Sequence, residues 1–523
     1  MDYLVVLIPL FPFVAAAIIG LGSLFNHLKG VASERTTAKI ANSAITLSCL
    51  LAIGFLVADL LEKNTGSYLL GQWLGSESLK FEISFITSGI NVILAALFSI
   101  LLVIITRFSV NYIHKELGFH RFFFILSLFS SAMLLLVLSS STIGTFIGWE
   151  IAGVCSYLLI GFAYDRSVAT INATHVFVTN RIGDAGFILG IGLTFYYTGS
   201  TDWVELNTAA ERLTTSTATV IALCFVVAAF AKSVQLPFTP WLARAMEGPT
   251  PSSALFYGAV MVHAGVYLMI LLQPVIEQAP LIMWLLIIGG LSTAVYSFIV
   301  GLTQTDVKSS ICFAISGQLG LMFLECGMGY WELAGWHLCA HAIVRSYQVL
   351  TAPSLLHYTH GNPMKPIMHK LAGLRWLYVI SLQRFWLDPL TDRTLVRPVY
   401  GLGRDLEYFD KHIIDRMMGL PSSTGHVITS LLQHEHGDLD KQRDNYELKE
   451  FGRGWGIAGK FFEWTAGVMG WFEDRLILKG IGMDMVDIGR QLGHAANRFE
   501  KLILKPRYPT LFGLIVLLIA ASL

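Results

Sequence analysis

The sequence predicts an all-α polytopic membrane protein, and its composition and its apolar runs lead to this fold class. Hydrophobic residues make up 54% of the 523 residues and charged residues only 14%, and the mean hydropathy is +0.61. Apolar runs of about 20 residues recur, which is the length a helix needs to cross about 30 Å of hydrocarbon. This composition excludes a soluble enzyme, and the net charge of zero gives no support for nucleic-acid binding.

The apolar runs predict about 12 membrane spans, most of them in the first 360 residues. The N-terminus, MDYLVVLIPLFPF, lacks a basic region and a small-residue cleavage site, so we expect a retained first span. A short run at 510–523 crosses the bilayer only with tilt or local thinning. The spans expected before residue 360 are 3–25, 40–61, 84–108, 122–139, 141–163, 175–198, 218–236, 252–273, 281–302, 308–326 and 332–357.

Basic residues in the loops predict the orientation. The first loop contains Lys29, Arg35 and Lys39, and the third contains Lys115 and Arg121. Loops rich in lysine and arginine stay on the cytoplasmic side of a bacterial membrane. We therefore expect a multi-pass protein of the bacterial cell inner membrane, with its N-terminus outside and residue 360 on the cytoplasmic side.

The composition divides the chain into a transmembrane domain at 1–360, a charged segment at 361–507 and a membrane anchor at 508–523. The charged segment holds more than half of the basic residues of the chain. Its amphipathic pattern, as in FEDRLILKGIGMDMVDIGRQLGHAANRFEKLIL, is typical of helices that lie on a membrane face or against other subunits. We expect it to be a docking element on the cytoplasmic face, and His434 and His436 to lie in a solvated turn.

The six cysteines all fall in apolar spans and lack metal-ligand spacing. We expect them to be small buried hydrophobic residues, without disulfides.

Polar residues inside the spans carry the functional information. A charged side chain at the centre of a membrane helix costs about 2.5–3.5 kcal/mol to insert, so each is a functional-site hypothesis. Arg181 and Asp184 are three residues apart, and His337, His341 and Arg345 are each four apart, so each set shares one helical face. The candidates for ion translocation are Glu150, Lys232, Lys308, His337 and His341, with Arg181, Asp184 and Arg345 as supporting charges.

Lys232 is the most informative of these residues because it lies five residues before Pro237 in AFAKSVQLPFTP. A broken helix frees backbone groups and admits water. A lysine beside a carboxylate gains or loses its proton when the partner moves, and histidine titrates near neutrality. Together these groups predict a proton path gated by a movable ion pair.

A structural interpretation stays open for some of the candidates. Arg181 and Asp184 can form a buried pair that only locks helices together. Lys308 stands near a helix end, where snorkelling to the interface explains it equally well. For His263, in VMVHAGVYL, a core hydrogen bond is the better interpretation.

Several long motifs resemble the antiporter-like membrane subunits of respiratory complex I and of Mrp antiporters, most closely the L-type subunit. They are GWEIAGVCSYLLIGF, FVTNRIGDAGFILG, AKSVQLPFTPWLARAMEGPTPSSAL, TDVKSS and HLCAHA, within residues 1–350. The resemblance implies an antiporter-like helix bundle with a broken transmembrane helix. It makes Glu150 the gating glutamate, Lys232 the lysine on the broken helix and Lys308 the central lysine, with His337 and His341 on the connecting helix.

The sequence departs from this family in four places. After LTAPSLLHYTHG, the further spans of the family and its exit-side lysine are not found, so the chain resembles a shortened L-type subunit. Arg345 stands where the L-type subunit often has lysine, and arginine holds a pair but does not relay a proton. Tyr257 and Arg244 replace a frequent histidine and a frequent aspartate.

A shortened L-type subunit resembles the membrane subunit of the bacterial inorganic-carbon-accumulation complex. The resemblance implies a large soluble zinc partner related to β-carbonic anhydrases, no cofactor in this chain, and coupling of the proton- or sodium-motive force to conversion of CO2 to bicarbonate. The alternatives are a proton-pumping subunit of an NADH–quinone oxidoreductase beside other membrane subunits, a cation/proton antiporter subunit, or a non-conducting scaffold. The sequence leaves the choice between H+ and Na+ open.

Overall fold

The computed structural model describes residues 2–352, except 65, 76–79 and 305, and residues 375–410 with residue 414. It divides into two compact units, Met1–Val396 and Arg397–Leu523. Within the second unit the described part is mainly α19 (Arg397–Phe409). Most of the predicted docking segment, His434, His436 and the anchor at 508–523 lie outside the described residues.

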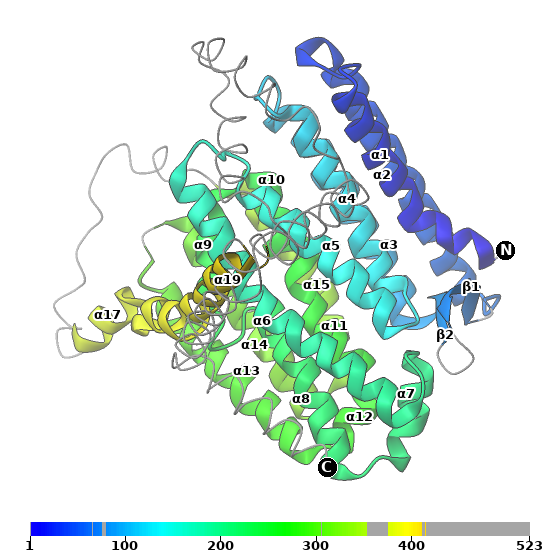
Figure 1. The fold of residues 1–523 in the computed structure, drawn as a ribbon, viewed down its shortest axis with the longest axis vertical. Coiled ribbons are helices and arrows are strands. Elements are labelled where there is room, and N and C mark those ends of the chain that lie inside the picture. The colour runs from blue at the N-terminus through cyan, green and yellow to red at the C-terminus, as the bar shows by residue number, and fades with distance from the viewer. Residues whose placement is uncertain are drawn as a thin grey trace, which may run out of the picture. The chain divides into compact units, whose positions relative to one another are not determined.

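The first unit is a helix bundle (Figure 1), and its all-α polytopic fold class is confirmed. In the described part of this unit, ten helical stretches are long and apolar enough to cross a membrane, and they match the first ten predicted spans. The main helices are α1 (Leu7–Leu24), α2 (Gly30–Leu60), α3 (Gly89–Tyr112), α4 (Phe119–Leu138), α5 (Thr142–Ile160), α6 (Ser167–Thr198), α7 (Trp203–Ala209), α8 (Thr215–Lys232), α9 (Pro240–Arg244), α10 (Thr250–Ser253), α11 (Ala264–Leu271), α12 (Gln273–Glu277), α13 (Pro280–Gly301), α14 (Val307–Gly327) and α15 (Trp331–Thr351).

The eleventh predicted span corresponds to α15, which is 21 residues long. It is not among the ten apolar helices, because titratable residues occupy so much of it. Its sequence, WELAGWHLCAHAIVRSYQVLT, is helical throughout. A helix of membrane-spanning length that carries this many polar groups needs to bury them against other helices.

A β-hairpin precedes α3, where the sequence predicts the start of a span at residue 84. Strands β1 (Ser67–Gly75) and β2 (Lys80–Ile86) pair antiparallel, and α3 begins only at Gly89. The predicted start was therefore wrong. Alternating apolar and polar residues in KFEISFI have the period of a strand, and Phe85 forms a bridge to Ser139 before α5.

Two spans are interrupted within the bundle. The first is the predicted break: α8 ends at Lys232, Val234 takes a left-handed backbone with φ +61°, and the chain resumes helically in α9. A β-branched residue rarely adopts this conformation. The second break was not predicted: a π-helix, η4 (Ala254–Ala259), and a 3₁₀ turn, η5 (Met261–His263), separate α10 from α11. Such π-segments are frequent at functional sites.

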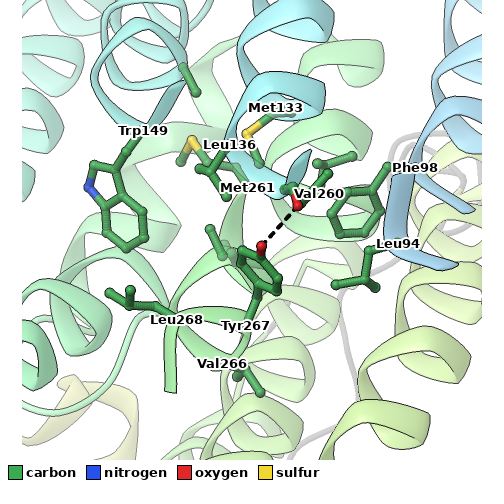
Figure 2. Packing of buried hydrophobic residues seen from close by; sticks show 14 of the residues in the cluster. Leu94, Phe98, Met133, Leu136, Trp149, Val260, Met261, Val266, Tyr267 and Leu268 are labelled. Carbon is green, nitrogen blue, oxygen red and sulfur yellow. Dashed lines mark hydrogen bonds between the residues drawn. The ribbon is translucent and has the colours of Figure 1, made fainter. Parts of the chain in front are cut away.

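Large aromatic side chains fill the core around these breaks, as Figure 2 shows for Trp149, Tyr267 and their neighbours. Trp149, Trp241 and Tyr267 are fully buried. Tyr267 donates a hydrogen bond to the backbone oxygen of Val137 at 2.9 Å, so α11 is tied to α4. Trp149 is packed in the same core, against the ring of Phe187. It contacts the charged groups described below.

Residues 375–396 form four short helical elements that pack against the bundle. We call this segment the strap. Its elements are α17 (Arg375–Leu382), η7 (Arg384–Trp386), α18 (Leu387–Thr391) and the π-helix η8 (Asp392–Val396). Ser381 donates to the backbone oxygen of Ile299 at 2.9 Å, and the rings of Phe385 and Tyr296 lie 5.6 Å apart. The strap is thus part of the first unit, although it comes from the segment assigned to docking by sequence.

Candidate functional site

Three of the predicted charges meet between α5 and α6. Arg181 forms ion pairs with Glu150 and, at 3.6 Å, with Asp184. The second oxygen of Asp184 accepts a hydrogen bond from the indole nitrogen of Trp149 at 2.8 Å. The Oε1 atom of Glu150 is buried and has no hydrogen-bond partner within the described chain. One arginine is therefore shared by two carboxylates, and one carboxylate oxygen remains available to another donor.

Lys232 stands at the last residue of α8, with 1% of its surface exposed. Its ammonium donates to the backbone oxygen of Trp149 at 3.3 Å and lies 4.9 Å from the centre of the Trp149 ring. A Cβ atom placed on Gly153 would lie 3.4 Å from Nζ, in ordinary van der Waals contact, so this residue of α5 lies beside the ammonium. Trp149 links Lys232 to Asp184, because the backbone of Trp149 binds the lysine and its side chain binds the aspartate.

The two helix breaks contact each other next to Lys232. Ser233 donates a hydrogen bond to the backbone oxygen of Val262 at 2.6 Å and accepts one from the backbone of Gly265 at 3.1 Å. A Cβ atom at Gly265 would lie 2.3 Å from the Ser233 hydroxyl and 2.5 Å from the Ala229 backbone oxygen. Only glycine permits this close approach of the two segments. His263 follows Val262 in the chain, so it lies where the two breaks are in contact.

A directional hydrogen-bond chain runs from Arg345 through His341 to His263. The arginine can only donate, and its Nε lies 3.3 Å from Nε2 of His341, so a neutral His341 carries its proton on Nδ1. That atom lies 2.8 Å from Nε2 of His263. A neutral His263 then carries its proton on Nδ1, which is buried and without a partner in the described chain. Sequence favours a core hydrogen bond for His263; the structure shows that its partner is a candidate site residue.

His337 lies beside His341 on α15, as the spacing predicts. We use the term row for the set Glu150, Arg181, Asp184, Lys232, His263, His337, His341 and Arg345. The ring centre of His337 lies 6.3 Å from that of His341. Its Nδ1 lies 2.9 Å from Glu325, and its Nε2 lies 2.9 Å from the amide oxygen of Gln318. Glu325 and Gln318 come from α14 and were missed. Glu325 is near the end of the span, where a charge looks like an ordinary interfacial residue, and Gln318 is an uncharged residue in its middle.

Among the described residues, Lys308 does not contact any residue of this row. It is the second residue of α14, and its ammonium donates to the hydroxyl of Thr250 at 2.7 Å. Tyr257, which stands where the family often has histidine, is buried on η4, and its hydroxyl has no partner within the described residues.

Charges on the strap meet the broken segment α9. Asp388 accepts from Nε of Arg244 at 3.3 Å and lies 3.5 Å from Arg384. Asp392 approaches His175 of α6 at 3.9 Å. Asp388 was missed because it is 144 positions from Arg244. Arg244, which replaces a frequent aspartate of the family, is therefore paired with a carboxylate from the strap.

The Arg244–Asp388 pair gives a testable prediction. We expect Arg244→Asp to lower the free energy of unfolding by about 1–2 kcal/mol, because two carboxylates would then face each other in a partly exposed site. Asp388→Arg in the same chain should restore part of this loss, because it re-forms the pair with reversed charges while Arg384 loses its carboxylate. Thermal melting of the purified protein measures both effects. The control is Arg166→Asp, because Arg166 pairs with Glu247 at a more exposed site; an equal loss there would contradict a specific role for the strap.

Within the described residues, the row contains groups that hold, donate and accept protons. No group of three or more His, Cys, Asp or Glu in this part could hold a metal ion. Carboxylates, lysines and histidines exchange protons when hydrogen bonds join them. The row therefore contains groups that are chemically able to transfer protons.

Comparison with known proteins places the same region in one family. The model "NADH:quinone oxidoreductase/Mrp antiporter, TM" matches residues 139–386, which contain every predicted site residue. "NAD(P)H-quinone oxidoreductase chain 5" of Synechocystis sp. is 33% identical over 401 residues, covering 73% of this chain and 58% of that protein. "NAD(P)H-quinone oxidoreductase subunit 5, chloroplastic" of Marchantia polymorpha is 34% identical over 399 residues, with 74% and 56% covered. The chain thus spans less than two thirds of the length of these relatives.

Solved structures show the same fold at lower identity. A chain of the Mrp complex from Dietzia sp. DQ12-45-1b gives a TM-score of 0.59 at 19% identity, over 98% of this chain and 62% of that one. A chain of the archaeal membrane-bound sulfane sulfur reductase gives 0.57 at 18% identity, over 74% and 80%. The family match, the relatives and the fold agree. Residues 139–386 of this chain belong to the NADH:quinone oxidoreductase/Mrp antiporter family, and the chain is similar to antiporter-like subunits of the L-type.

Proposed function

We propose that this chain conducts protons as the energy-coupling membrane subunit of a larger complex. The observation that carries the proposal is the row of titratable groups at the two helix breaks. Lys232 is joined to Asp184 through Trp149, and its neighbour Ser233 contacts the break that contains His263. His341 follows within hydrogen-bond distance of His263. Buried titratable groups in such an arrangement are costly and mark ion pathways in membrane proteins.

In this proposal the shared arginine is the gate. Arg181 binds both Glu150 and Asp184. When it moves fully to Glu150, Asp184 is left to stabilise the charged form of Lys232. When it moves to Asp184, that stabilisation falls and the lysine releases its proton. In this proposal the released proton leaves at the break that directly follows Lys232.

Arg345 controls the second half of the row. Its N–H group occupies Nε2 of His341, and this arginine stays charged. A proton reaches His341 at Nε2 only when Arg345 moves aside. The proton on Nδ1 of His341 then passes to Nε2 of His263. The proton on Nδ1 of His263 passes in turn to a water molecule that enters at the break, because this atom has no acceptor within the described chain.

Reconstitution tests this path. We expect His341→Gln to lower proton flux into liposomes by about 100-fold or more under an imposed potential, because positioned proton-transfer groups contribute effects of this size. Glutamine keeps hydrogen bonding but does not titrate. The matched control is His27→Gln, because His27 is exposed and outside the row. Equal flux from both variants and the unaltered protein would remove His341 from the path.

At a finer level, we propose that the chain drives inorganic-carbon uptake through a zinc-containing partner resembling β-carbonic anhydrases. The support is the resemblance to a shortened L-type subunit and the mixed charge of residues 361–507, which suits docking to a soluble protein. The zinc would belong to that partner. We place the chain in the bacterial inner membrane with its N-terminus outside, on the loop charges.

A second candidate is a pumping subunit of an oxidoreductase. The observation that favours it is the name of the two relatives, NAD(P)H-quinone oxidoreductase chain or subunit 5. Purification of the chain from its native membrane distinguishes the two. A large soluble zinc protein in stoichiometric amount supports carbon uptake, whereas quinone oxidoreductase subunits support the alternative.

A further inference from the structure

A cavity of about 640 Å³ lies where α2, α3 and α4 meet. Its lining combines three basic side chains, Arg35, Lys39 and Arg107, with the amides of Asn42 and Asn111. The row of proton-transfer groups uses none of these residues, so the cavity calls for a separate explanation.

The cavity is positively charged because its only acidic group is already bound. Glu34 is 6% exposed. It accepts from Nδ1 of His114 at 2.7 Å and from the backbone of Lys115 at 3.2 Å. Among the described residues, no ion pair is formed by Arg35, Lys39 or Arg107, and all three are exposed. The cavity therefore presents cations to a ligand from outside the chain.

Helix lengths place this cavity at the level of the lipid headgroups. Helix α2 has 31 residues, which is about 46 Å at 1.5 Å per residue, whereas the hydrocarbon core is about 30 Å thick. Its first turns therefore extend beyond the hydrocarbon, and Arg35 and Lys39 are in them. Arg107 is near the end of α3, which finishes at Tyr112 on the same side.

Apolar side chains form the other part of the lining. They include Val31, Ala38, Val110 and Phe119. A free anion gains nothing from such a surface, whereas the glycerol and upper acyl groups of a lipid bury apolar area there. The loop charges put this side of the membrane in the cytoplasm, where anionic lipids attract basic residues.

We propose that this cavity binds the phosphate headgroup of an anionic phospholipid, such as phosphatidylglycerol or cardiolipin. Arg35, Lys39 and Arg107 hold the phosphate, the two asparagines donate to its ester oxygens or glycerol hydroxyls, and the apolar lining contacts the glycerol backbone. The lipid thereby ties the ends of α2 and α3 together beside α4.

Lipid retention by the full-length protein tests the proposal. The protein is placed in nanodiscs of phosphatidylcholine with a minor fraction of phosphatidylglycerol, extracted gently, and analysed by native mass spectrometry. We expect Lys39→Gln with Arg107→Gln to weaken phosphatidylglycerol binding by about 30-fold, since each basic group near a membrane surface contributes about fivefold. Lys39→Arg should keep the binding.

The matched control is Lys29→Gln with Lys115→Gln, which removes two charges from the same face outside the lining. Equal loss in both double variants would overturn the proposal, because it would show general surface attraction. A second arm adds inorganic phosphate or glycerophosphate to the unaltered protein. Displacement of the lipid by either at millimolar concentration would also overturn it, since the site would then be one for a free anion. If the double variant does not fold, selectivity of the unaltered protein for phosphatidylglycerol over phosphatidylcholine decides, and equal retention of both overturns the proposal.

Discussion

Replacement of Lys232 by methionine is expected to abolish proton conduction while the protein stays folded. Methionine fills the same space beside Trp149 but has no proton to exchange. Lys232 donates a hydrogen bond to the backbone oxygen of Trp149, and Glu150 and Asp184 keep Arg181 as their partner. The substitution therefore removes a buried charge without leaving either carboxylate without a cation, so the fold should tolerate it.

Arginine at the same position separates two roles of the lysine. Lys232→Arg keeps the positive charge but does not release a proton near neutral pH. We expect it to fail in proton flux if Lys232 relays protons, and to conduct if only a fixed charge is needed. Glu150→Gln should also stop conduction, because Arg181 would then have Asp184 as its only charged partner in the site.

Proton flux in liposomes, driven by an imposed potential, measures these effects. Thermal melting of each variant and its co-purification with native partners control for folding and assembly. Lys63→Met is the matched control, because Lys63 is an exposed lysine in the loop after α2. Full conduction by Lys232→Met would contradict the proposed path and favour a scaffold.

Much of the site could be predicted because its signals are local in sequence. A lysine five residues before a proline predicted the break at Lys232. Spacings of three and four residues predicted that Arg181 and Asp184, and His337 and His341, share helix faces, and the structure shows both pairs close together. The first ten spans followed from hydropathy for the same reason.

The contacts that complete the site join residues far apart in the chain. His263 meets His341 across 78 positions, and Arg244 meets Asp388 across 144. Periodicity reports which face of a helix a residue occupies but not which helix that face contacts. The break at η4 and η5 escaped prediction because Pro249 and Pro251 stand at the start of the span, where proline is ordinary in a helix. The tight approach of Gly265 to Ser233 accompanies the break.

The direct partner of Glu150 is a further case. Sequence favours a switch between Glu150 and Lys232, whereas the structure places Arg181 on the glutamate and Trp149 on the lysine. Glu150 and Lys232 are therefore not in direct contact with each other, and Arg181 and Trp149 are the groups that lie between them. The proposed switch remains a prediction, with Arg181 as its moving part.

Cells that depend on this chain for inorganic carbon are expected to lose bicarbonate accumulation when an uncoupler collapses the ion gradient. Moving one charge through 100 mV yields about 2.3 kcal/mol, and a tenfold change in an equilibrium needs about 1.4 kcal/mol. One proton per turnover therefore gives a bias of about fifty-fold toward bicarbonate. Without the gradient this bias disappears, while the partner still equilibrates CO2 and bicarbonate.

The same loss is expected from Lys232→Met with the gradient intact, because the coupling path would be closed. Uptake of labelled bicarbonate measures both effects, and immunodetection of the chain and its partner controls for their amounts. Lys63→Met should accumulate bicarbonate normally. If accumulation persists under the uncoupler, or if Lys232→Met instead abolishes proton pumping coupled to NADH or NADPH oxidation in isolated membranes, then the chain serves a quinone oxidoreductase. That outcome would leave the proton path in place and replace only its partner, because the row from Glu150 to His341 is the same for either task.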